Sequence, residues 1–133
     1  MRPDLTDYVL DASALLCLIN AEPGADRVLR VLQGSAISVV NIAEVIAKRL
    51  EFGDDYALLT ADIERLDMRI VDMNFSQAAL CARMRAPTRA SGLSLGDRAC
   101  LALAKANHAT ALTCDRAWMS FAEPLGIAIE LVR

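Results

Sequence analysis

Four acidic residues stand at predicted junctions between strands and helices, where carboxylates can meet and do chemistry. They are Asp11, Glu44, Asp97 and Asp115. In a parallel sheet, ligands bind beyond the carboxyl ends of the strands. Three of the acids lie in segments that follow predicted strands, so we expect them to face one crevice. Asp97 opens the helix that leads into the strand before Asp115, so this rule does not fix its place.

A crevice lined by carboxylates is expected to bind a hard cation. Carboxylates within about 4–6 Å of one another repel, whereas Mg²⁺ prefers oxygen ligands and binds through carboxylates and substrate phosphate. Mg²⁺ or Mn²⁺ held in this way lowers the pKa of a bound water and stabilises charge on a phosphoryl oxygen. The only histidine, His108, has no catalytic motif around it, so no Ser–His–Asp or Cys–His set is available, and no P-loop is present. The residues alone therefore predict metal-assisted phosphodiester hydrolysis.

Each acid also has a purely structural interpretation as part of a helix cap. Asp11 and Asp115 suit plain N-caps, as does Ser13 just after Asp11. The other two stand three residues after a capping residue, Asn41 before Glu44 and Ser94 before Asp97, which resembles a capping box. Taken singly, both interpretations stay open for each acid. The recurrence of four acids favours the metal site.

The hydrophobic pattern predicts strands that alternate with helices. Such an order gives an α/β fold with a central parallel sheet and helices on both faces. The length of 133 residues suits a single domain over residues 1–133. The alternating segment 68–73 is expected nearer the sheet edge. Strands are predicted over residues 8–10, 36–40, 68–73, 109–113 and 127–132, and helices over 12–20, 23–33, 41–52, 54–66, 76–85, 94–107 and 115–122.

Composition narrows the class of protein further. Hydrophobic residues make up 55% of the chain, as expected for a sheet covered on both faces. No apolar run approaches the ~18 residues of a membrane span, and residues 1–7 lack the apolar segment of a signal peptide. We therefore expect a cytoplasmic protein without a membrane partner. The cysteines form no C-x-x-C pair, which argues against zinc; they are Cys17, Cys81, Cys100 and Cys114.

The net charge of −3 does not by itself indicate nucleic-acid binding, which usually shows as a basic excess. Local basic residues are nevertheless candidates for contact with phosphates. Arg98 and Arg116 directly follow acids of interest, so each has a second interpretation as a partner that orients a carboxylate. The candidates are Arg83, Arg85, Arg89, Arg98 and Arg116.

Four segments in order resemble the PIN-domain family, and in particular its VapC-type toxins. The resemblance covers the chain from Tyr8 to Val132. It is carried by Val-Leu-Asp-Ala-Ser-Ala-Leu at 9–15, by Ser38 with Glu44 six residues on, by Gly-Leu-Ser-Leu-Gly-Asp-Arg-Ala-Cys-Leu-Ala-Leu-Ala at 92–104, and by Leu-Thr-Cys-Asp-Arg at 112–116. One departure is Trp118, at a position where the family often has Phe.

The resemblance implies a PIN-like three-layer α/β/α fold and a Mg²⁺- or Mn²⁺-dependent endoribonuclease, the toxin of a type II toxin–antitoxin pair. It implies RNA as substrate, a cognate VapB-type antitoxin and a homodimer. It also implies that the hydroxyls of Ser13 and Thr113 support the pocket. The number of acids varies within the family, so Asp115 is the ligand it supports least. The implied metal-binding and catalytic acids are Asp11, Glu44, Asp97 and Asp115.

The alternative is a PIN-like fold that has lost activity and serves as a protein-binding module. The presence of all four acids argues against it. A receiver-type phosphoacceptor domain would have adjacent acids and a late lysine, but Ala12 follows Asp11 and no lysine follows Lys105. A haloacid-dehalogenase-type phosphatase would have Asp-x-Asp at residues 11–13, where this chain has Asp-Ala-Ser.

Overall fold

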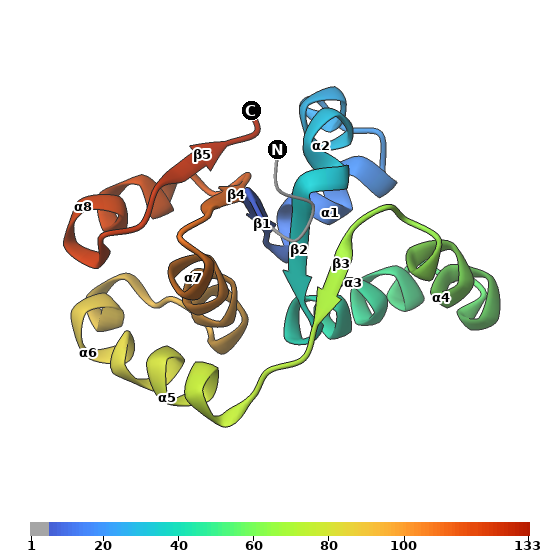
Figure 1. Cartoon of the computed structure of the whole chain (residues 1–133). Coiled ribbons are helices and arrows are strands. Elements are labelled where there is room, and N and C mark those ends of the chain that lie inside the picture. Colours follow the sequence, from blue (N-terminus) through green and yellow to red (C-terminus); the bar gives the residue numbers. More distant parts are fainter. Residues whose placement is uncertain (1–5) are drawn as a thin grey trace.

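The computed structural model describes residues 6–133, and its centre is a single sheet of five parallel strands (Figure 1). The strand order is β3-β2-β1-β4-β5, with β3 and β5 at the edges, as expected for the segment 68–73. Residues 1–5, part of the segment expected to lack a signal peptide, lie outside the described residues. The strands are β1 (Tyr8–Leu10), β2 (Ser35–Ser38), β3 (Arg69–Val71), β4 (Thr110–Thr113) and β5 (Ile129–Leu131).

Helices connect the strands, as right-handed crossovers between parallel strands require. Within residues 6–133, no helix is long and apolar enough to cross a membrane. The α-helices are α1 (Ala12–Ile19), α2 (Ala25–Val31), α3 (Val39–Glu51), α4 (Tyr56–Glu64), α5 (Phe75–Arg83), α6 (Arg85–Thr88), α7 (Leu95–Asn107) and α8 (Ala122–Leu125). The 3-10 helices are η1 (Leu32–Gly34), η2 (Arg89–Ser91) and η3 (Arg116–Phe121).

Two apolar cores lie on opposite faces of the sheet, because neighbouring strand residues point to opposite sides. Val9 packs in a core with α5, α7, η3 and α8. Leu10, the next residue, packs in a second core with α1, α2, α3 and α4. In Figure 1, α5, α6 and α7 lie to the left of β2 and α4 lies to the right. The three-layer α/β/α arrangement is therefore confirmed.

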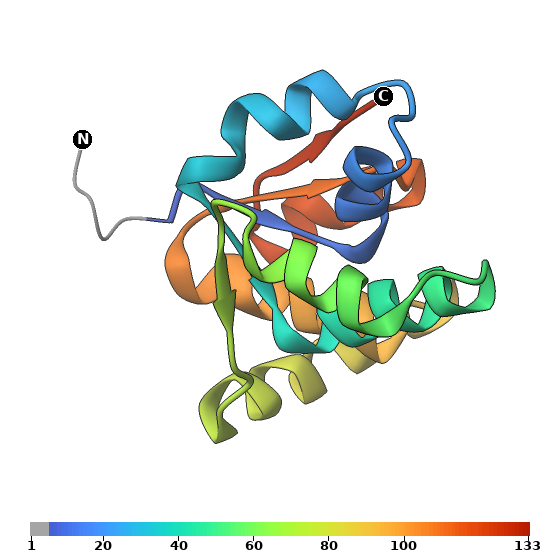
Figure 2. The same cartoon turned by 90° about the vertical axis from the view of Figure 1, so that its right-hand side faces the viewer.

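The C-terminus returns to the turn between α1 and α2. Arg133 pairs with Glu22 at 2.7 Å, and Figure 2 shows the chain's end beside this turn. Gly24 in the turn has φ of 101° and would bring an added Cβ within 2.5 Å of Val132 Cγ1. Glycine is needed there both for its backbone conformation and for space.

Two predicted boundaries are wrong, and both concern where helices begin or end. Val39 and Val40 were expected in a strand but form the first turn of α3, because the Ser38 hydroxyl caps that helix through the Val40 amide (3.2 Å). The helix predicted over residues 76–85 ends at Arg83, and a separate short helix, α6, begins at Arg85 with Pro87 in its first turn, a position that proline tolerates.

Candidate active site

All four predicted acids line one pocket, which encloses about 290 Å³. Asp11 and Asp115 lie just beyond the ends of β1 and β4, Glu44 lies in α3, and Asp97 lies in the first turn of α7. The pocket is thus built at the carboxyl edge of the sheet, where ligand sites of such sheets occur. The remaining lining residues are Ala12, Ser13, Leu16 and Lys48.

Asp11 is the most buried acid of the pocket, at 4% exposure. Its Oδ1 accepts hydrogen bonds from the Ala14 amide (2.8 Å) and the Ser13 hydroxyl (2.7 Å), and its Oδ2 accepts one from the Thr113 hydroxyl (2.6 Å). Ser13 Oγ in turn accepts from the Cys114 amide (2.9 Å), which ties α1 to the end of β4. The carboxylate is therefore held in one orientation by α1 and by β4.

Burial raises the pKa of Asp11 from 3.8 to about 6. The hydrogen bonds from Thr113, Ser13 and Ala14 favour the ionised carboxylate and offset part of this rise. The charge of Asp97 adds to it. Ionisation of this buried carboxylate is unfavourable without a nearby positive charge, so a bound cation would stabilise its charged form.

Glu44 does not belong to a capping box, and that prediction is wrong. Since α3 begins at Val39, Glu44 lies in its second turn, and Asn41 is an interior residue rather than a cap. The Asn41 amide donates from Nδ2 to Glu44 Oε1 (2.9 Å) and to the carbonyl of Gly96 (3.0 Å). Glu44 thus lies against the first turn of α7, which carries Asp97.

Asp97 and Asp115 cap helices and line the pocket at the same time. The Ser94–Asp97 capping box is confirmed, with Asp97 Oδ2 accepting from the Ser94 amide (3.1 Å) and Ser94 Oγ accepting from the Asp97 amide (3.1 Å). Asp115 Oδ1 accepts from the Ala117 amide (3.0 Å) at the start of η3. Within residues 6–133, Asp97 Oδ1 and Asp115 Oδ2 form no hydrogen bond. Each acid therefore keeps one oxygen for another partner.

Lys48 is a lining residue that the sequence reasoning missed. It stands four residues after Glu44 in α3, and side chains at this spacing share one face of a helix. This spacing from Glu44 is the feature of the sequence that could have identified Lys48 as a pocket residue. Lys48 is exposed, and it forms no ion pair in the part of the chain that the structure describes.

The candidate arginines do not behave alike. Arg98 is 8% exposed, and its Nη1 donates to the Cys81 carbonyl (3.2 Å), so it joins α7 to α5. It pairs with no carboxylate among residues 6–133, so the predicted role of orienting a carboxylate is wrong, and its burial argues against contact with a phosphate. The arginines that are exposed, and so open to a phosphate, are Arg83, Arg85, Arg89 and Arg116.

The donor set of the pocket fits a hard cation in type, although its acids are not gathered as a closed cage. Within residues 6–133, no three His, Cys, Asp or Glu side chains are grouped closely enough to hold a metal ion together. Mg²⁺ is commonly held by one or two carboxylates together with waters and substrate phosphate. Glu44, Asp97 and Asp115 line the same pocket as the buried Asp11, and each has one carboxylate oxygen that forms no hydrogen bond within residues 6–133, which suits that open kind of site.

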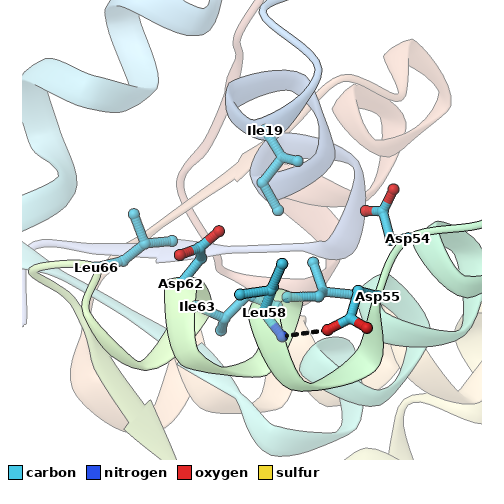
Figure 3. A pocket seen from close by; sticks show the side chains of 8 residues that line it. Ile19, Asp54, Asp55, Leu58, Asp62, Ile63 and Leu66 are labelled. Carbon is cyan, nitrogen blue, oxygen red and sulfur yellow. Dashed lines mark hydrogen bonds between the residues drawn. The ribbon is translucent and has the colours of Figure 1, made fainter.

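A second pocket, of about 370 Å³, lies between α4 and the end of α1 (Figure 3). Ile19 of α1 points toward Leu58 and Ile63 of α4. We call this pocket the α4 groove. Its other lining residues are Asp54, Asp55, Leu59, Asp62 and Leu66. None of the four acids at the carboxyl edge lines it.

Comparison with solved structures finds the same fold in bacterial toxin–antitoxin complexes. A toxin–antitoxin complex from Klebsiella pneumoniae matches with a TM-score of 0.74 at 19% identity, covering 96% of this chain and 98% of that chain. A DNA-bound VapBC from Salmonella typhimurium matches with a TM-score of 0.71 at 17% identity, covering 97% and 100%. VapBC-5 from Mycobacterium tuberculosis matches with a TM-score of 0.60 at 21% identity, covering 96% and 98%.

The sequence matches a family model but no curated protein. The family model of the PIN domain matches residues 8–124, which include all four acids of the pocket. The chain therefore belongs to the PIN-domain family.

Proposed function

We propose that this chain is a Mg²⁺- or Mn²⁺-dependent endoribonuclease, the toxin of a type II toxin–antitoxin pair, with one PIN domain over residues 1–133 and a cytoplasmic site of action. The observation that carries the proposal is the pocket that collects Asp11, Glu44, Asp97 and Asp115 at the carboxyl edge of the sheet. Four acids from separate elements share this pocket, and capping alone requires no such convergence.

The four acids would hold the metal ion. The ion would supply a water of lowered pKa and stabilise charge on the phosphoryl oxygens of the scissile phosphodiester. Ser13 and Thr113 keep the Asp11 carboxylate in place before any ion binds, so little reorganisation is needed. The Lys48 ammonium lines the same pocket and would neutralise a phosphate oxygen of RNA.

The proposed RNA path follows exposed arginines outside the pocket. Arg116 directly follows the pocket residue Asp115, and three more exposed arginines lie on α5, α6 and η2. RNA is bound largely through its phosphates, and this binding weakens as salt rises. A local basic surface on a chain of net charge −3 suits weak general binding, with specificity coming from an unpaired loop of the RNA.

The proposed partners are a VapB-type antitoxin and a second copy of the chain. The solved structures with this fold include toxin–antitoxin complexes, which supports the antitoxin. The α4 groove offers a surface for it, because Tyr56 and Leu58 are 63% and 67% exposed on α4. Exposed apolar surface of this kind marks protein contacts. Its described lining is apolar apart from three aspartates, of which Asp54 and Asp62 pair with Arg49 and Arg65, so it suits an apolar segment of the antitoxin.

Cleavage of RNA by the purified chain tests the proposed activity. Cleavage should stop in excess EDTA, return when Mn²⁺ is added in excess, and be unaffected by a zinc-selective chelator. Activity that persists unchanged in EDTA would contradict the metal mechanism. A chain that binds its partner protein but cleaves no RNA with Mn²⁺ would instead support the protein-binding module.

A further inference from the structure

The side chain of Asn41 bridges the two helices that carry Glu44 and Asp97. From α3, its Nδ2 donates to Glu44 Oε1 (2.9 Å) and to the carbonyl of Gly96 in α7 (3.0 Å). Asn41 is 1% exposed, and its bond to Gly96 is buried, whereas its bond to the exposed Glu44 is partly buried. One amide group therefore ties the Glu44 carboxylate to the backbone of the residue just before Asp97.

Gly96 leaves the space in which that carboxylate lies. A Cβ added at Gly96 would stand 2.1 Å from Glu44 Oε1 and 2.5 Å from its carboxyl carbon. Real Cβ atoms do not approach other atoms this closely, so any larger residue would push the carboxylate away. Glycine is needed here for room rather than for a left-handed backbone, since Gly96 is an ordinary helical residue of α7.

The pairing also fixes which way the Asn41 amide faces. Both of its partners are acceptors, so the NH₂ group must face them and Oδ1 must face away. In the part of the chain that the structure describes, this buried Oδ1 has no hydrogen-bond partner. A buried polar atom without a partner is unfavourable. Packing alone therefore does not explain an asparagine at this position. The hydrogen bond that it donates to Glu44 places that carboxylate.

We propose that Asn41 is a positioning residue for the metal site, acting through Glu44 and together with Gly96. The two hydrogen bonds of Asn41 and the space left by Gly96 together form what we call the clamp. The clamp holds Glu44 Oε1 against α7 and leaves Oε2, which forms no hydrogen bond within residues 6–133, to bind the cation. This inference rests on the proposed function, because it assigns Asn41 a role toward the ion that the acids would hold. Groups that orient metal ligands commonly change metal affinity by about 10–100-fold when removed.

The test measures Mn²⁺ affinity of the full chain without RNA, from the electron paramagnetic resonance signal of free Mn²⁺. Asn41→Ala should weaken Mn²⁺ binding by about 10–100-fold. Gly96→Ala should weaken it similarly with Asn41 intact, because the added Cβ displaces the carboxylate. The control is Thr88→Ala, which removes a buried hydroxyl bonded to the Met84 carbonyl (2.7 Å) outside the pocket. It should lower stability and leave Mn²⁺ affinity unchanged.

Two further measurements separate positioning from a merely structural role. RNA cleavage by Asn41→Ala should recover when Mn²⁺ is raised in proportion to the lost affinity, which a misfolded pocket would not allow. In a Glu44→Gln background, adding Asn41→Ala should cause no further loss of Mn²⁺ affinity, because the residue it positions no longer binds the ion. Fully additive losses would overturn the positioning role.

The outcomes distinguish this inference from the proposed function. Wild-type Mn²⁺ affinity in both Asn41→Ala and Gly96→Ala, in a wild-type chain that binds Mn²⁺ and cleaves RNA, overturns the clamp alone. A wild-type chain that neither binds Mn²⁺ nor cleaves RNA overturns both. If Asn41→Ala does not fold, Gly96→Ala and its combination with Glu44→Gln decide the question.

Discussion

Three of the four pocket acids are helix caps as well as candidate metal ligands. Asp97 and Asp115 each use one oxygen to cap and keep the other, so capping orients the carboxylate without consuming it. Asp11 differs, because both of its oxygens accept hydrogen bonds inside the protein. The capping and metal-binding interpretations are therefore compatible at the level of single residues, and substitution must separate them by effect.

Asp11→Asn should stabilise the metal-free chain and abolish RNA cleavage. The pKa of Asp11 is about 6 in the folded chain against 3.8 for an unperturbed aspartate, a shift that costs about 3 kcal/mol of folding free energy once the group is ionised. This penalty is absent below about pH 4, grows as pH rises to about 6 and is complete above it. The gain from Asn should follow the same course in urea unfolding at pH 4, 6 and 8.

A capping role alone gives a different result for Asp11→Asn. Asn caps helices about as well as Asp, so a residue that only caps would keep normal cleavage after the substitution. Near-normal turnover of RNA by Asp11→Asn would mean that Asp11 only caps the helix. A stability gain that does not change between pH 4 and pH 8 would contradict the raised pKa.

Mn²⁺ affinity should fall with acidity around pH 6. Protons compete with a cation for a carboxylate, and burial has raised the pKa of Asp11 to about 6. Above that pH Asp11 is already ionised and its contribution to the pH dependence should be small. Below it, affinity should fall by up to about tenfold per pH unit. Titration of Mn²⁺ between pH 5 and 8 checks this, and a flat profile would contradict it.

At the scale of elements, the sequence predicts well where local signals and packing agree. The parallel sheet, the edge position of β3 and the Ser94–Asp97 capping box all follow from hydrophobic pattern and cap chemistry. The boundary at Val39 and Val40 does not, because β-branched residues suggest a strand. In the structure the Ser38 cap and the packing of α3 override that propensity.

Contacts between distant elements could not be predicted from the sequence. Asn41 contacts Gly96, which lies 55 residues further along the chain, and neither residue type indicates such a contact. Burial of Arg98 is equally hidden, because its charge suggests an exposed side chain. Lys48 is the intermediate case: its spacing from Glu44 is local, but only the fold shows that this face of α3 lines the pocket.

The arginines Arg98 and Arg116 should respond to substitution in opposite ways. Arg98 donates a buried hydrogen bond between α7 and α5, and a bond to a charged group contributes about 1.5–3 kcal/mol. Arg98→Ala should therefore lower the free energy of unfolding and leave the salt dependence of RNA binding unchanged. Arg116→Ala should leave stability unchanged and reduce the salt slope by about one unit.

Both measurements are made in an Asp11→Asn background, so that the RNA stays intact. Urea unfolding gives the stability and RNA affinity at several salt concentrations gives the slope. A reduced slope in Arg98→Ala would mean that the buried guanidinium reaches RNA after all. An unchanged slope in Arg116→Ala would move the RNA path away from the residue beside Asp115.

At the scale of the whole molecule, catalysis and partner binding have separate surfaces in this proposal. The acids meet at the carboxyl edge of the sheet, whereas the α4 groove lies between α1 and α4 and shares none of their side chains. Both pockets nevertheless draw on α1, through Ser13 and Leu16 in one and Ile19 in the other. A partner seated in the groove would thus contact the helix that Asp11 caps.

Leu58→Glu should weaken binding of the antitoxin while leaving cleavage by the free chain unchanged. Leu58 is 67% exposed, so a charge there is tolerated by the fold, but it would be buried unpaired against an apolar segment of the partner. Loss of one such contact typically costs 2 kcal/mol or more at the centre of an interface, about 30-fold in Kd. The matched control is Phe75→Glu, a 90% exposed residue of α5 outside the groove. Calorimetric titration with the proposed VapB-type antitoxin should show the loss for Leu58→Glu only. Equal affinity in both variants would place the antitoxin elsewhere, and a loss in Phe75→Glu alone would point to α5.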